Sequence, residues 1–236
     1  MDNVNGGVTL TVPYEKAVPG TVAVLVKEDG TREVIRKSVA DEGEVSIPLD
    51  GSATVEIMDN RKVFTDTAGH WAGDAIDFVT AHELYAGTSA TTFAPNTPMS
   101  RGMLARVLHN LESNPDHTFT GAFSDLNGHW ATDSILWAAD RGIVGGYSNG
   151  TFGANDDISR EQLAVMLWRY AGSPMTNHSL NHFADVNSIS GYARTALAWA
   201  NENGIVGGVG NHVLDPQGKA TRAQVAAMLM RMMLNT

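Results

Sequence analysis

Residues 145–172 read GGYSNGTFGANDDISREQLAVMLWRYAG: two glycines, a polar turn and then an amphipathic helical pattern. The same order of features occurs twice more, as AGTSATTFAPNTPMSRGMLARVLHNLE (86–112) and GGVGNHVLDPQGKATRAQVAAMLMRMM (207–233). Internal repeats of this kind decide the architecture of a chain before single residues do. Three copies of one unit therefore organise the chain from residue 63 onward.

The copies keep a constant register. Each opens with Phe-X-Asp, and the aspartates Asp66, Asp125 and Asp185 are 59 and 60 residues apart. In every copy a glycine precedes an arginine by 14 residues: Gly87 and Arg101, Gly146 and Arg160, Gly208 and Arg222. We therefore divide this part of the chain into three motifs, residues 63–122, 123–182 and 183–236.

Each motif is expected to hold two helices. The first helices are predicted near residues 71–83, 130–141 and 192–203. The second carry apolar side chains at i, i+3, i+4 and i+7, as in Leu104, Val107, Leu108 and Leu111. Three equivalent stripes cannot each be buried alone, so we expect them to pack together. They predict a mainly α fold: a pseudo-threefold prism of three repeats around a three-helix core.

Residues 1–62 have a different pattern. Five short β-branched segments, separated by Gly, Pro and Asp-Gly signals, predict strands at 8–12, 21–26, 32–37, 44–49 and 53–58. Glu28-Asp29-Gly30-Thr31 is typical of a hairpin turn. We expect a small all-β, sheet-like or sandwich-like spacer domain before the repeats.

Composition excludes several classes of function. The 236 residues carry 26 acidic and 16 basic side chains, a net charge of -10, which argues against nucleic acid and anionic lipid as partners. There is no cysteine and no apolar run of about 18 residues, so we expect neither thiolate metal sites nor membrane insertion. Residues 1–10 lack the features of a signal peptide, which leaves the compartment open.

The start of each second helix combines a cap with an arginine. Ser100, Ser159 and Thr221 are good N-cap residues, and each precedes an arginine. Gln162 and Gln224 complete a capping box in the second and third motifs, while the first motif has Met103 there. An arginine at the first helical position lies beside unpaired N–H groups and the positive end of the helix dipole, which favours a carboxylate ligand. The candidate anion-binding residues are Arg101, Arg160 and Arg222.

Other recurring residues suit a carbohydrate. Trp71, Trp130 and Tyr192 are aromatic side chains that can face a sugar or staple the core. Gly87, Gly146 and Gly208 permit a ligand to approach the backbone closely. Asp66, Asp125 and Asp185 are retained as candidates, although bracing of the following loop is the simpler explanation. His70 and His129 lack a third ligand, so we expect no metal site and no cofactor.

An enzymatic function is not supported. Asp156 and Asp157 are adjacent in one loop, which does not set the separation that paired glycosidase carboxylates need. No Ser-His-Asp arrangement or phosphate loop is evident. If the full protein is a hydrolase, its catalytic domain is expected upstream of residue 1.

The repeats resemble the S-layer homology domain of bacterial surface proteins. The resemblance rests on Phe-X-Asp, "HWA", "GIVGG" and the Ser/Thr-Arg helix start, and covers about residues 63–234. The usual Thr-Arg-Ala-Glu motif of this family reads SRGM, SREQ and TRAQ here, so the arginine is kept and the glutamate is lost.

The resemblance implies an extracellular, non-covalent anchor on the cell wall. Family members bind secondary cell-wall polysaccharide, commonly pyruvylated N-acetylmannosamine, in grooves between adjacent repeats. The first motif has Glu83-Leu84 in place of Gly142-Ile143 and no capping box, so we expect its groove to contribute least. A self-assembling lattice, a protein-interaction module and the anchor of a larger secreted enzyme remain alternatives. We expect Arg160→Ala and Arg222→Ala to leave folding intact and to weaken polymer binding.

Overall fold

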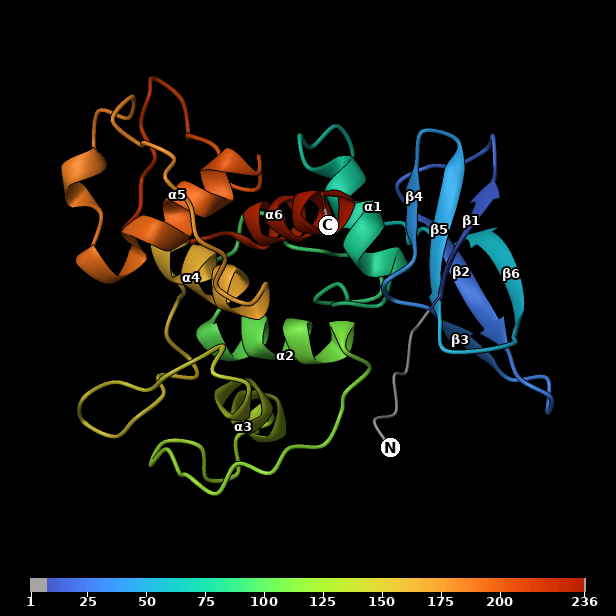
Figure 1. Cartoon of the computed structure of the whole chain (residues 1–236), viewed down its shortest axis with the longest axis horizontal. Helices are drawn as coiled ribbons and strands as arrows, with labels where there is room; N and C mark the ends of the chain where they lie inside the picture. Colours follow the sequence, from blue (N-terminus) through green and yellow to red (C-terminus); the bar gives the residue numbers. More distant parts are fainter. Residues whose placement is uncertain (1–7, 236) are drawn as a thin grey trace. The chain divides into compact units, whose positions relative to one another are not determined.

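The computed structural model describes residues 8–235, which divide between two compact units, one ending at Ala94 and the other beginning at Pro95 (Figure 1). Helices make up 30% of the structure and strands 17%. The expected mainly α class is therefore wrong. The helices are short and joined by long loops, and a complete β region precedes them.

Six strands form the β region: β1 (Val8–Pro13), β2 (Thr21–Val26), β3 (Arg32–Val34), β4 (Val39–Asp41), β5 (Glu44–Leu49) and β6 (Thr54–Asp59). They make two antiparallel three-stranded sheets, in the orders β1-β5-β4 and β3-β2-β6. Ala23 of β2 and Val45 and Ile47 of β5 are buried in one cluster, so the two sheets share a core. The alternation of buried and exposed residues along β5 agrees with one face on that core.

The sequence predicted five of these strands and missed β4. The expected hairpin is present: the N–H of Lys27 donates to the carbonyl of Thr31 at 2.9 Å, and Gly30 has a φ of 80°. The strand predicted over 32–37 ends at Val34, because Ser38 donates to the carbonyl of Ile35 and closes a turn. The chain then forms β4, which has only three residues.

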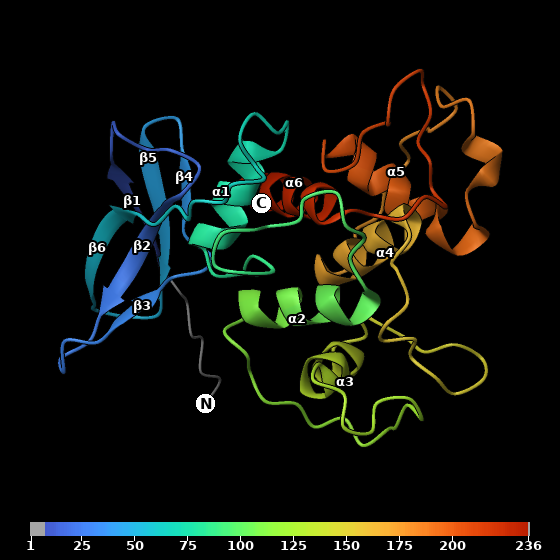
Figure 2. The same ribbon diagram turned by 180° about the vertical axis from the view of Figure 1, so that it is seen from behind.

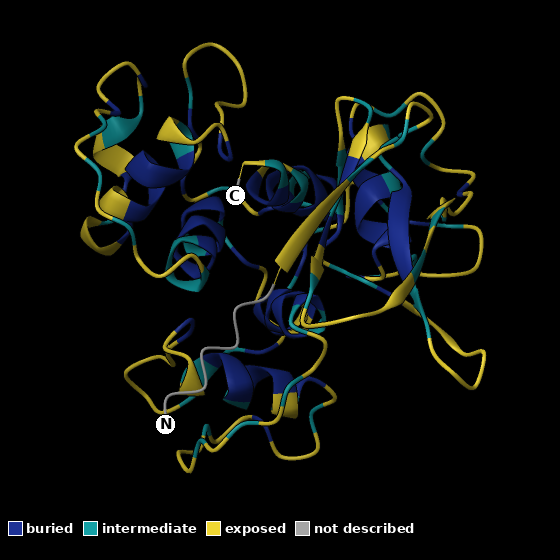
Figure 3. Cartoon of the chain, turned by 45° about the vertical axis from the view of Figure 1, so that its right-hand side comes forward, coloured by how far each residue is buried: buried dark blue, intermediate teal, exposed yellow. Residues whose placement is uncertain are grey.

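Six α-helices follow: α1 (Gly73–Ala81), α2 (Arg101–Leu111), α3 (Thr132–Asp140), α4 (Arg160–Tyr170), α5 (Arg194–Glu202) and α6 (Arg222–Leu234). Two 3-10 helices, η1 (Val186–Ser188) and η2 (Gly191–Ala193), precede α5. The helices present mainly buried faces, while the connecting loops are largely exposed (Figure 3). These helices are the two expected in each motif.

In the first unit, α1 packs directly on the β region. Ala81 joins Val22, Val24 and Val34 in one buried cluster. At the end of α1, the ring nitrogens of the fully buried His82 lie 2.7 Å from the carbonyl oxygen of Phe78 and 2.9 Å from that of Ser38. The β region is therefore continuous with the first helix of the first motif and is not a detached spacer.

This contact accounts for the divergence of the first motif. After α3 and α5 the chain turns at Gly142 and Gly204, both with a φ of 68°. After α1 the equivalent residue is Glu83, with a φ of 56°, and its carboxylate lies 3.5 Å from the guanidinium of Arg36. The replacement of glycine by glutamate thus supplies an ion pair to the β region at a backbone conformation that glycine adopts more easily.

In the second unit, α2 and α4 each pack against the first helix of the following motif, α3 and α5 respectively. Both views show these pairs side by side (Figures 1 and 2). His109 of α2 stacks on Trp137 of α3, with 5.0 Å between the ring centroids. These pairs link consecutive motifs within residues 95–235.

The segments before α2, α4 and α6 are joined by a closed cycle of backbone hydrogen bonds. The N–H of Met99 donates to Ala220, that of Ala220 donates to Ile158, and that of Ile158 donates back to Met99, each at 2.9 Å. All three residues are fully buried. Because a buried N–H without a partner is costly, each motif depends on its neighbours at this point.

We predict that His82→Ala destabilises the first unit by about 2–4 kcal/mol, because it leaves a cavity and removes the contact with Ser38. Amide hydrogen exchange of α1 and β2 measures the effect. Arg141, the exposed residue at the same position after α3, is the matched control, and Arg141→Ala should change exchange of α3 by less than about 0.5 kcal/mol. Equal, small effects of the two substitutions would show that the β region does not support α1.

Candidate functional site

The second helices begin where the sequence predicted. Ser100, Ser159 and Thr221 are the N-caps of α2, α4 and α6, and each side chain accepts a hydrogen bond from the N–H three residues later. Gln162 and Gln224 complete capping boxes in the second and third motifs, whereas Met103 leaves the first motif without one. The arginines therefore occupy the first helical position of each helix.

The N–H groups of these helix starts are not free, which corrects the anion site expected there. The first N–H groups of α2, α4 and α6 donate to the carbonyls of Asp156, Gly218 and Thr97 at 2.9–3.0 Å. The second N–H groups donate in the same way to residues 154, 216 and 95. With the third N–H bonded to the cap side chain, little of the positive helix end remains available to a ligand.

Two arginines connect one motif to the next through their side chains. The guanidinium of Arg101 donates to the carbonyls of Phe152 and Gly145, both at 3.1 Å. Arg160 repeats this arrangement in the following motif, with bonds to Leu214 at 2.9 Å and Gly207 at 2.7 Å. A planar guanidinium suits two carbonyls in one plane, so these arginines hold adjacent motifs in register.

All three arginines are buried: the exposed fractions of residues Arg101, Arg160 and Arg222 are 7%, 3% and 6%. Burial lowers the pKa of Arg101 and of Arg160, although a guanidinium stays charged. The guanidinium of Arg101 also lies over the rings of Tyr147 and Phe152, at 4.9 and 4.6 Å from their centroids. The expectation that such arginines are dispensable for folding does not agree with this geometry.

One pocket in the second unit brings several predicted residues together; we call it the Arg101 pocket. It has a volume of about 280 Å³ and is lined by Arg101, Ile143, Val144, Gly145, Gly146, Tyr147, Gln162, Val165, Met166, Arg169 and Tyr192. Its residues come from all three motifs: Arg101 from the first, residues 143–169 from the second and Tyr192 from the third. Pockets for small ligands begin at about this size, so the space suits one or two sugar rings.

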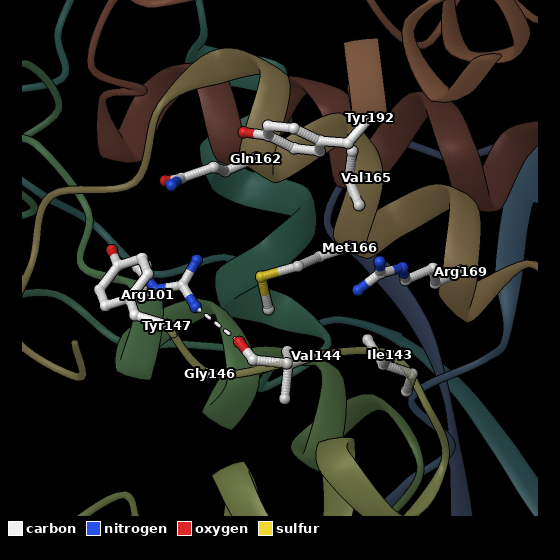
Figure 4. A pocket seen from close by; sticks show the side chains of 11 residues that line it. Arg101, Ile143, Val144, Gly146, Tyr147, Gln162, Val165, Met166, Arg169 and Tyr192 are labelled. Atoms are coloured by element: carbon white, nitrogen blue, oxygen red, sulfur yellow. Dashed lines mark hydrogen bonds between the residues drawn. The ribbon is translucent and has the colours of Figure 1, made fainter. Parts of the chain in front are cut away.

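Two arginines line the Arg101 pocket. Arg101 and Arg169 approach it from opposite sides with Met166 between them (Figure 4). No carboxylate is among its lining residues, in a chain whose net charge is -10. Tyr147 and Tyr192 add aromatic rings, and the hydroxyl of Tyr147 donates to the carboxylate of Asp156 at 3.0 Å. The pocket can therefore pair cationic groups with an acid and aromatic rings with an apolar sugar face.

Arg169 of this pocket was missed by the sequence analysis, as was Tyr147. Arg169 lies nine residues after Arg160, and Arg231 lies nine residues after Arg222. The first motif has Asn110 at that position. The recurrence is visible in the sequence, but only the folded chain shows that Arg169 and Arg101 share a pocket.

The three Phe-X-Asp aspartates brace loops within their own motifs. Asp66 accepts from the N–H groups of residues 93 and 94, Asp125 from residues 152–154, and Asp185 from residues 214 and 215, at 2.7–3.4 Å. This arrangement supports the bracing role and gives these carboxylates no place in the Arg101 pocket. Burial opposes the charge of Asp125 and of Asp185, yet the backbone hydrogen bonds outweigh it and lower the pKa of both.

The three recurring glycines are required by internal packing. A Cβ on Gly146 would lie 2.6 Å from the ring of Phe123 and 2.7 Å from the carbonyl oxygen of Thr151. Gly87 and Gly208 meet the rings of Phe64 and Phe183 in the same way. Only Gly146 of the three lines the Arg101 pocket, so close approach of a ligand does not explain the recurrence.

The aromatic candidates differ in their surroundings. Trp71 and Trp130 are 64% and 60% exposed, so neither is a core staple. The Nδ1 atoms of the preceding histidines, His70 and His129, accept from the N–H groups of residues 72 and 131, which begin the first helices. Tyr192 stands at the equivalent position in the third motif and is the one of the three that lines the Arg101 pocket.

Residues 8–235 include no group of three or more His, Cys, Asp or Glu side chains placed to hold a metal ion. Within the same residues, no helix combines the length and the apolar character that a membrane span requires.

The repeats identify the class of protein. The family model of the S-layer homology domain matches residues 63–102, 122–164 and 182–226, which is more than half of the chain. The chain belongs to the S-layer homology domain family, and the resemblance seen in the motifs is confirmed. Domains of this family are non-catalytic modules that anchor proteins to the cell wall.

Relatives carry the same region inside longer proteins. An amylopullulanase of Thermoanaerobacterium thermosulfurigenes is 29% identical over 97% of this chain and 13% of its own length. An endoglucanase of a Bacillus species is 31% identical over 78% of the chain and 20% of its own length. A cellulosome-anchoring protein of Acetivibrio thermocellus is 28% identical over 50% of the chain and 27% of its own length. The chain thus spans between 13% and 27% of these relatives.

Arg160→Lys should destabilise the second unit by about 1–3 kcal/mol, because one ammonium cannot reproduce the planar pair of bonds to Leu214 and Gly207. Hydrogen exchange of α4 and α5 measures the loss. Arg194→Lys, at an exposed arginine of α5, is the control and should leave exchange unchanged. Unchanged exchange in Arg160→Lys would contradict the connecting role.

Asp125 should make stability depend on pH in the acid range. Its pKa is lowered in the folded protein, so its contribution is complete above the unfolded value of about 3.9 and is lost as the pH falls through the folded value. The melting temperature of Asp125→Asn should lie below that of wild type at pH 6, and the gap should narrow below about pH 4. A gap that stays constant between pH 6 and pH 3 would contradict this. Asp133→Asn, at an exposed aspartate, is the control.

Proposed function

We propose that this chain is a non-covalent cell-wall anchor whose Arg101 pocket binds an acidic cell-wall polysaccharide. The observation that carries the proposal is the lining of the pocket: two arginines and no carboxylate line it, in a chain of net charge -10. Family membership supports anchoring and an extracellular place on the cell wall.

The chemistry of the pocket favours a sugar that bears a carboxylate. Arg101 has two N–H groups committed to Phe152 and Gly145, which fixes its plane and leaves the charge to attract an anion. Arg169 supplies a second guanidinium, and Met166 with the two tyrosines supplies apolar surface for a ring. Pyruvylated N-acetylmannosamine, which carries one carboxylate on a ketal, is the candidate unit.

The chain itself is proposed to be non-catalytic. Amylopullulanase and endoglucanase relatives contain this region as a minor part of their length, so attachment of a larger secreted enzyme is one use of the module. A lattice role is the second candidate, since an S-layer protein of Bacillus licheniformis is 32% identical over 44% of the chain. Retention on intact sacculi and loss after removal of the polysaccharide favours the anchor, while retention on stripped peptidoglycan favours the lattice or another ligand.

Arg169→Ala should weaken binding of the methyl glycoside of pyruvylated N-acetylmannosamine by about tenfold, because it removes one charge-assisted contact of about 1.5 kcal/mol or more. Isothermal titration calorimetry measures the affinity. Arg141→Ala removes the same charge from an exposed position and is the matched control. The non-pyruvylated glycoside should bind more weakly to wild type. The proposal would be refuted if wild type bound the two glycosides with equal affinity. It would also be refuted if Arg169→Ala and Arg141→Ala bound the pyruvylated glycoside with equal affinity.

A further inference from the structure

We propose that Glu161 is a positioning residue that fixes Tyr192 as the aromatic wall of the Arg101 pocket. The inference rests on the proposed function for its binding consequence, but its structural basis is independent of any ligand. Glu161 is the second residue of α4, from the second motif, and Tyr192 belongs to the third.

The carboxylate of Glu161 is held entirely by the third motif. The hydroxyl of Tyr192 donates to Oε1 at 2.9 Å, the hydroxyl of Ser190 donates to the same oxygen at 2.7 Å, and the N–H of Ser190 donates to Oε2 at 3.0 Å. Only 2% of Glu161 is exposed. A buried carboxylate that accepts three hydrogen bonds at a helix N-terminus is held in one position, so it also holds the loop that bears Tyr192.

The bond also determines what Tyr192 offers to a ligand. Its proton is directed to Glu161, and burial together with that bond raises the pKa of Tyr192 to about 12. The hydroxyl therefore has no proton to donate to an acidic sugar. Tyr192 presents its ring, while Arg101 and Arg169 present charge (Figure 4). The hydrogen bond to Glu161 thus leaves the apolar contact to Tyr192 and the charged contacts to the two arginines.

The other motifs lack this device. The residue equivalent to Glu161 is Gly102 in α2 and Ala223 in α6, and neither has a side chain that can accept a hydrogen bond. A Cβ at Gly102 would lie 2.8 Å from the carbonyl oxygen of Ala154, so a glutamate would not fit there without a shift. Trp130, which stands where the third motif has Tyr192, therefore has no carboxylate from α2 to hold it.

The first experiment needs no glycan. Tetranitromethane nitrates phenols through the phenolate, so Tyr192 should react several-fold faster in Glu161→Ala than in wild type, as measured by peptide mapping. Tyr147, whose hydroxyl is bonded to Asp156, is the internal reference and should react equally in both. Asp133→Ala removes an acidic second residue from α3 and is the matched control. Equal nitration of Tyr192 in Glu161→Ala and wild type would overturn the positioning role.

The second experiment measures binding of the pyruvylated methyl glycoside in a double-mutant cycle. Glu161→Ala and Tyr192→Phe should each weaken binding by about fivefold to tenfold, and the double variant should be no weaker than either, because both act through one bond. A full further loss in the double variant would show that Glu161 does not act through Tyr192.

Two outcomes separate this inference from the proposed function. If wild type does not bind the glycoside but nitration of Tyr192 is altered in Glu161→Ala, the proposed ligand is wrong and the positioning role of Glu161 stands. If Glu161→Ala does not fold, as its melting temperature would show, Tyr192→Phe decides, since Tyr192 is more than half exposed. Unchanged affinity in that variant would overturn the inference.

Discussion

The closed cycle of hydrogen bonds among Met99, Ile158 and Ala220 is the constraint on which residues 95–235 depend. Each N–H is buried, and each finds its acceptor in another motif, so no motif can satisfy its own helix start. The first two N–H groups of each second helix extend the same pattern. Repetition of the sequence is thus explained by mutual satisfaction of buried donors, in addition to burial of the apolar stripes.

Under the proposed function, this constraint places recognition of the polysaccharide away from the helix ends. Because neighbouring carbonyls already occupy the backbone donors, attraction of an acid must come from side chains. Arg101 serves both purposes: two carbonyls of the second motif fix its guanidinium, and the same group lines a pocket with Arg169. Arg160 makes the equivalent connection but does not line that pocket. Equivalent residues in a repeat can therefore share a structural role without lining the same pocket.

Contacts between residues close in the sequence were predictable, whereas contacts between distant residues were not. The caps at Ser159 and Thr221, with their glutamines, depend on residues three apart and were found correctly. β4 has only three residues, which is too short to give a recognisable pattern. The predicted mainly α class was wrong because the β region and the long loops make up more of the chain than the prediction allowed. The divergence at Glu83 was visible, but its cause lies in Arg36, 47 residues earlier, which no local pattern indicates. Glu161 was overlooked because its partners are in another motif.

A crystal structure of the chain with the methyl glycoside of pyruvylated N-acetylmannosamine would test the central claim most directly. The account places the carboxylate within hydrogen-bond distance of Arg101 or Arg169 and the sugar ring against Tyr192, with the carbonyl bonds at the helix starts intact. A glycoside whose carboxylate instead accepts from the first backbone N–H groups of α4 or α6, with those carbonyls displaced, would contradict it.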